Sequence, residues 1–135
     1  MKTKPIFDLE DLRRMATAAE SHAFNNGWAV TIAIVDDGGH LLWLQRLDGA
    51  APISASIAQA KARTAALGRR ESKVYEEMIN QGRTSFLSAP GLEGMLEGGV
   101  PVMVDGQCIG AVGVSGVKST EDAEIARAGI SALGA

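Results

Sequence analysis

The feature of this sequence that most constrains its fold is the dipeptide Asp105-Gly106, which separates two strand-like segments with only two residues. Val100–Val104 precedes it and Gln107–Ser115 follows it, and both segments are rich in apolar and β-branched residues. Asp-Gly is typical of the two-residue β-hairpin turn. Because so short a turn joins only antiparallel strands, the sequence predicts an antiparallel hairpin here.

A second hairpin is predicted nearer the start of the chain. Trp28–Val35 is almost continuously apolar, the turn-forming sequence Asp-Asp-Gly-Gly occupies residues 36–39, and His40–Arg46 is apolar again. This order of strand, turn and strand is typical of a β-hairpin. A nearly continuous apolar strand indicates burial on both faces, so we expect this strand at the centre of a sheet with helices on each side.

Four helices are predicted around the two hairpins. Asp8 is a suitable N-cap for the first helix, and Asn25-Asn26-Gly27 suits its end. The predicted helices are Leu9–Asn25, Ile53–Leu67, Ser72–Gln81 with Ser72 as its cap, and Ser119–Leu133 with a capping box from Ser119 to Asp122. Glycine and proline interrupt residues 84–99, which predicts an irregular segment there.

Together these elements predict an α+β fold with a central antiparallel sheet, since tight turns do not connect parallel strands. A chain of 135 residues corresponds to one ordinary domain, so we expect residues 1–135 to form a single domain. Cys108 is the only cysteine, which excludes an intrachain disulfide framework and a zinc site built on paired cysteines.

The charge balance and the apolar runs limit the partners. A net charge of -3 with 4% aromatic residues gives neither a basic surface nor a row of rings for stacking bases, so nucleic acid is not an expected partner. No apolar run approaches the roughly 20 residues that span a bilayer, and the chain starts with a charged segment rather than a signal peptide. We therefore expect a cytoplasmic protein without a membrane partner.

The two histidines are the first candidates for chemistry. His22 and His40 can each serve as a metal or haem-iron ligand or as a general base. His40 directly follows the 36–39 turn, where the carboxylate of Asp36 or Asp37 can orient its ring. Lys61 lies at the border of a helix face: such a lysine usually reaches out to water, but beside Asp36 or His40 it would bind an anion.

The glycines offer a further candidate. Gly110, Gly113 and Gly116 lack the order of a dinucleotide-binding loop, and Ser115 does not occupy a nucleophile elbow. These glycines are suited to close packing of a helix on a strand. Alternatively, backbone N–H groups near Ser115 and near Gly98-Gly99 can bind a carboxylate or phosphate.

Several stretches in a specific order resemble one family. They are residues 33–41, 60–65, 98–102, 110–116 and 122–126. With them the chain resembles, from Leu9 to Leu133, the GlcG/HbpS family of small haem-binding-like proteins, which includes the C-terminal domain of PduO-type proteins. The resemblance implies a profilin-like α/β/α fold with a central antiparallel sheet, assembled into tetramers or octamers.

The resemblance also implies a ligand. Family members bind haem or related tetrapyrroles, and in PduO-type relatives a histidine of the first helix holds the haem iron. His22 stands at the matching place in this sequence. The secreted, haem-sensing relatives carry a glutamate-rich iron-binding segment that this chain lacks, so an extracellular redox-sensing role is not expected.

Three functions follow as hypotheses. The first is a homo-oligomeric binding protein for haem, a related tetrapyrrole or a small anionic metabolite, with candidate ligand-binding residues His22, Asp37, Gly98, Gly99 and Ser115, and Met15 beside His22. The second is a cofactor-independent enzyme acting on a small carboxylic acid, with His40 or Asp36 as the base and Lys61 binding the carboxylate. The third is an accessory or scaffold subunit.

Overall fold

A four-stranded antiparallel sheet forms the centre of the structure, a computed structural model that describes residues 1–134. Its strands are β1 (Thr31–Asp36), β2 (Leu41–Arg46), β3 (Gly99–Val104) and β4 (Gln107–Ser115), arranged in the order β2-β1-β4-β3. Both predicted hairpins are confirmed. β1 is a central strand, as its apolar sequence predicts, but it begins at Thr31 rather than at Trp28. The N–H of Trp28 donates to the carbonyl of Ala23, so Trp28 still belongs to the exit of the preceding helix.

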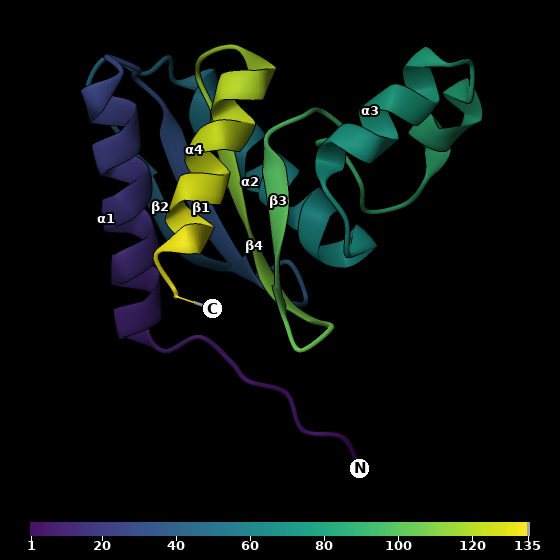
Figure 1. Cartoon of the computed structure of the whole chain (residues 1–135). Helices are drawn as coiled ribbons and strands as arrows, with labels where there is room; N and C mark the ends of the chain where they lie inside the picture. Colours follow the sequence, from purple (N-terminus) through teal and green to yellow (C-terminus); the bar gives the residue numbers. More distant parts are fainter. Residues whose placement is uncertain (135) are drawn as a thin grey trace.

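Helices cover both faces of the sheet (Figure 1). α1 (Leu9–Asn25) and α4 (Ser119–Ser131) lie on one face, and α2 (Ile53–Gly68) lies on the other. The alternation of side chains along β1 divides its residues between the two layers: Ile32 and Ile34 join the core under α1 and α4, whereas Ala33 and Val35 join the core under α2. The fold class predicted from the sequence is therefore confirmed.

The packing of α2 on the sheet depends on small residues. Four alanines of α2, together with Ala33 of β1 and Ala111 of β4, make up most of this layer of the core. A Cβ atom at Gly113 of β4 would lie 2.2 Å from the carbonyl oxygen of Ala58, so only glycine fits at this position. Gly113 thus allows the close helix-on-strand packing that the sequence predicted, whereas a Cβ at Gly110 or Gly116 would meet Val35 or Ala29 rather than a helix.

The remaining elements lie beside β3 (Figure 1). α3 (Ser72–Asn80) ends one residue before the predicted limit, and the segment predicted as irregular contains a short 3-10 helix, Thr84–Ser88. α4 ends at Ser131, two residues before the predicted Leu133.

Capping predictions have mixed outcomes. Asp8 caps α1 as predicted: its carboxylate accepts the Asp11 N–H at 2.9 Å, and the Asp11 carboxylate accepts the Asp8 N–H at 3.0 Å. The capping box from Ser119 to Asp122 is wrong, because the Glu121 side chain instead accepts the Lys118 N–H. Asp122 is turned into the protein interior.

Ser72 does not cap α3, so the cap predicted from the sequence is wrong here. Its hydroxyl is buried, donates to the carbonyl of Leu96 at 2.5 Å and accepts the N–H of Gly99 at 2.8 Å. Ser72 therefore ties the start of α3 to the loop that leads into β3.

Candidate functional site

The carboxylate of Asp36 is occupied by its own turn. Its Oδ1 atom accepts the backbone N–H groups of Gly38 and His40, both at 2.9 Å, and lies 3.1 Å from Nδ1 of His40. This pattern stabilises the turn between β1 and β2. The His40 side chain is 77% exposed, so the predicted contact between ring and carboxylate exists but faces water.

Asp37, which the sequence analysis named as a candidate ligand-binding residue, lies at the surface. Its carboxylate forms an ion pair with the ammonium of Lys4 from the N-terminal segment. The hydrogen bond from Lys4 lowers the pKa of Asp37 below its usual range. Asp37 thus connects the N-terminal segment to the turn.

Lys61 is buried and paired with a residue that the sequence analysis did not connect to it. Its Nζ atom donates to the carbonyl of Val114 at 3.0 Å and to the carboxylate of Asp122 at 3.1 Å. The other carboxylate oxygen of Asp122 accepts the N–H of Val117 at 3.1 Å. Burial raises the pKa of Asp122, although the Lys61 charge acts in the opposite direction.

The structure does not bring Lys61 to Asp36 and His40. Asp36 is opposite Gly110 in the register of β1 and β4, whereas the Lys61 ammonium contacts Val114, which is opposite Ile32. Asp36 is four positions along the strand from Ile32, which corresponds to about 13 Å. The cluster that the acid–base enzyme hypothesis requires is therefore not formed, because Lys61 reaches the other end of the sheet.

Two of the candidates, Gly98 and Gly99, pack against Lys61, and Ser115 follows Val114, whose carbonyl accepts from the Lys61 ammonium. Gly98 has a φ of +136°, and a Cβ atom there would lie 2.7 Å from Nζ of Lys61. The Gly99 N–H donates to Ser72, so it is not free for a ligand. Ser115 is buried at the end of β4. The Gly98 carbonyl accepts the N–H of Val114, so the backbone of Gly98 and Gly99 is engaged inside the protein, which indicates a structural role.

His22 lies on the opposite layer, at the end of α1. Its Nε2 atom is 2.6 Å from a carboxylate oxygen of Glu124 on α4, and its ring centroid is 6.0 Å from that of Trp28. The side chain is 33% exposed, so a ligand can reach the ring from solvent. The sequence predicted Met15 beside His22 at this surface, but Met15 is fully buried in the core.

A cavity of about 440 Å³ is lined in part by Trp28. Its walls include the exposed ring of Phe24, which directly follows Ala23 on α1, together with Leu47 after β2. Trp28 therefore lies next to the His22 ring and also lines this cavity.

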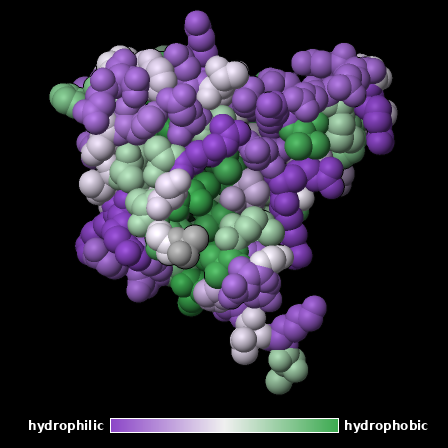
Figure 2. All heavy atoms as spheres, viewed as in Figure 1, coloured by the Kyte–Doolittle hydropathy of each residue, from purple (hydrophilic) through white to green (hydrophobic). Residues whose placement is uncertain are grey.

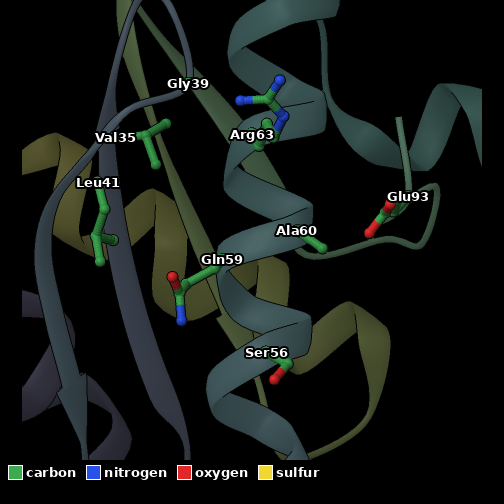
Figure 3. Close-up of a pocket in the computed structure, with 8 residues that line it drawn as sticks. All are labelled: Val35, Gly39, Leu41, Ser56, Gln59, Ala60, Arg63 and Glu93. Atoms are coloured by element: carbon green, nitrogen blue, oxygen red, sulfur yellow. The ribbon is translucent and has the colours of Figure 1, made fainter. Parts of the chain in front are cut away.

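A second cavity, of about 320 Å³, lies on the α2 side of the sheet (Figure 3). Three successive turns of α2 and the strands β1 and β2 form its walls, with lining residues Val35, Gly39, Leu41, Ser56, Gln59, Ala60, Arg63 and Glu93. Sequence reasoning missed Arg63 and Glu93. The spacing of Ser56, Gln59 and Arg63 along one helix face is the signal that was available.

Neither a metal-binding cluster nor a membrane-spanning helix is found in the described residues 1–134. Within residues 1–134 no group of three or more His, Cys, Asp or Glu side chains is arranged to hold a metal ion. In the same part of the chain, every helix is too short or too polar to cross a bilayer.

Comparisons with known proteins give consistent results. Residues 7–131 match the family described as haem degrading protein HbpS-like. The chain is 61% identical over 115 residues to Protein GlcG of Escherichia coli K12, covering 85% of each chain. It is 28% identical over 140 residues to corrinoid adenosyltransferase PduO of Salmonella typhimurium, covering 98% of this chain and 40% of PduO.

Solved structures are similar over nearly the whole chain. A double mutant of HbpS from Streptomyces reticuli has a TM-score of 0.90 with 32% identity, covering 100% of this chain and 92% of that one. A complex of PduOC with heme has a TM-score of 0.89 with 26% identity, covering 96% of each chain.

Proposed function

Because the chain belongs to the HbpS-like family of haem degrading proteins, we propose that it is a small-molecule-binding protein whose ligand is haem or a related tetrapyrrole. The similarity to a PduOC structure that contains heme supports this proposal. The observation in this chain that carries it is the position of His22, a partly exposed imidazole beside an indole ring.

His22 would supply a nitrogen ligand for a haem iron, and the neighbouring Trp28 would supply an apolar wall. A haem supplies an iron centre that accepts an imidazole nitrogen, and its macrocycle favours apolar surface. Trp28 offers such a surface next to the His22 ring. The Glu124 side chain is 53% exposed, so it can move away from Nε2 at little cost and leave that nitrogen free.

We also propose that the protein is a homo-oligomer. β2 is an edge strand whose Leu41, Leu42 and Leu44 are all at least 40% exposed, and Ile53 at the start of α2 is 63% exposed. An exposed apolar edge strand favours association with another chain. The resemblance implies a tetramer or an octamer, and light scattering of the purified protein measures which is formed. A cytoplasmic location stays a prediction.

Haemin titration tests the proposed ligand. Binding should produce a shifted, intensified Soret band, and His22→Ala should weaken binding at least about tenfold, since it removes the iron ligand. His40→Ala is the matched control, because it removes the other histidine from an exposed turn. Equal haemin affinity of the wild type and His22→Ala would exclude His22 as the ligand.

A further inference from the structure

The cavity beside Arg63 is separate from the surface that carries His22. Val35, which lines the cavity, packs in the layer under α2, whereas the neighbouring Ile34 packs under α1 and α4. Glu124, the partner of His22, belongs to α4. The two places therefore lie on opposite faces of the sheet, and the cavity needs its own explanation.

Arg63 is held in place while the end of its side chain remains available. Its Nε atom donates to the carbonyl of Gly91 at 3.3 Å. A Cβ atom at Gly39 would lie 3.0 Å from Cγ of Arg63, so the turn packs closely on its alkyl chain. In the described residues 1–134, Nη1 and Nη2 make no hydrogen bond or ion pair. These two nitrogens have the geometry that binds a carboxylate through paired hydrogen bonds.

Glu93 gives the same cavity a negative charge (Figure 3). Arg63 and Glu93 are not joined by an ion pair, although both side chains line this one cavity of the described chain. A ligand with a carboxylate at one end and an ammonium at the other complements both charges. A dicarboxylate would be repelled by Glu93, and a diamine would be repelled by Arg63.

The remaining walls suit the middle of such a ligand. Val35 and Leu41 supply apolar surface from β1 and the start of β2. Gln59 donates through Nε2 to the carbonyl of Ala55 at 3.1 Å and lies on the strand side of α2, away from Glu93 (Figure 3). The volume of about 320 Å³ is at the small end of the range for ligand sites.

We propose that this cavity binds a small zwitterion of the amino-acid class. The carboxylate is bound by Arg63, the ammonium is bound by Glu93, and the carbon chain between them crosses the side of α2 that carries Ala60, with Val35 and Leu41 as further apolar walls of the cavity. This site is independent of the haem site and adds a second, chemically different ligand to the same chain.

Calorimetric titration of the full chain with simple probes tests the proposal. Glycine, 4-aminobutanoate and 6-aminohexanoate span different distances between the two charges, and butanoate and butylamine each carry only one of them. At least one amino acid should bind about tenfold tighter than either single-charge probe, which is the value of one charged hydrogen bond. Equal affinity for butanoate and for the amino acids, or no binding by any probe, would overturn the proposal.

Variants of the two charged residues complete the test. Arg63→Gln and Glu93→Gln should each weaken the amino-acid probe about tenfold. Arg69→Gln is the control, because Arg69 follows the end of α2 and does not line the cavity. Unchanged affinity for the amino-acid probe in both cavity variants would overturn the proposal that this cavity is the binding site. Haemin binding should stay the same in Arg63→Gln, so a failure of this proposal is distinct from a failure of the haem proposal.

Discussion

The ammonium of Lys61 lies 3.1 Å from the carboxylate of Asp122, and both side chains are almost fully buried. The pair joins α2 on one face of the sheet to α4 on the other, past the end of β4. The two layers of helices are thus connected by one charged contact as well as by the sheet between them.

Removing one member of this pair should strongly destabilise the fold. Lys61→Met leaves the Asp122 carboxylate buried without its counter-charge, which typically costs about 3–5 kcal/mol of unfolding free energy. Replacing both residues, as Lys61→Met with Asp122→Leu, should cost less than the sum of the two single variants. Urea unfolding of the four proteins measures this coupling, and additive losses would show that the pair does not act as a unit.

Gly98 should tolerate alanine much less well than Gly106. Both residues have positive φ, but a Cβ at Gly98 would lie 2.7 Å from the Val114 carbonyl oxygen, whereas one at Gly106 meets nothing within 4 Å. We expect a loss of about 1 kcal/mol for Gly106→Ala and of about 3 kcal/mol for Gly98→Ala. Thermal and urea unfolding compare them, and similar losses would contradict the steric explanation.

The capping carboxylate of Asp11 predicts a pH dependence. A hydrogen bond from the Asp8 N–H, the largest cause, lowers the pKa of Asp11 below 3.8. Because the pKa of Asp11 is lower in the folded than in the unfolded protein, its ionised carboxylate stabilises the fold at pH values above the unfolded-state pKa. This stabilisation is lost as the pH falls through the folded-state pKa. Asp11→Asn should therefore lower the urea midpoint at neutral pH and have little effect well below pH 3.8. A constant difference across this range would contradict the prediction.

Glu124→Ala should strengthen haemin binding. The Glu124 carboxylate lies 2.6 Å from the nitrogen that the iron would use, so the two compete for Nε2 of His22. Removing the carboxylate should raise the affinity severalfold, as expected when one exposed contact no longer has to be broken. Glu77→Ala is the matched control, since it removes the same charge from an exposed ion pair on α3. Weaker haemin binding in Glu124→Ala would instead mean that the carboxylate supports the ligand.

Local sequence signals predicted the fold well. The Asp105-Gly106 turn, the apolar sequence of β1 and the Asp8 cap each depend on neighbouring residues, and each is confirmed. The cap assigned to Ser72 was wrong because its hydroxyl bonds Leu96 and Gly99, and the capping box from Ser119 to Asp122 was wrong because the Asp122 carboxylate pairs with Lys61. A hydroxyl or carboxylate beside a helix start has the same local sequence whether it faces the helix or the core.

The candidate sites were predicted less completely. The contact between Asp36 and His40 spans one turn and could be expected, but the pairing of Lys61 with Asp122 joins residues 61 positions apart. Nothing in the spacing indicates which end of the sheet a buried lysine reaches. The helical spacing of Ser56, Gln59 and Arg63 was a signal for that face of α2, but nothing local indicates that Glu93 lines the same cavity.

Chemical rescue of His22→Gly measures the central claim most directly. If the imidazole of His22 holds the haem iron, this variant should lose the Soret spectrum of the wild type in the presence of haemin, and added free imidazole should restore it. A wild-type spectrum in His22→Gly without imidazole would contradict the claim, as would a lost spectrum that imidazole does not restore in a variant whose circular dichroism shows it to be folded.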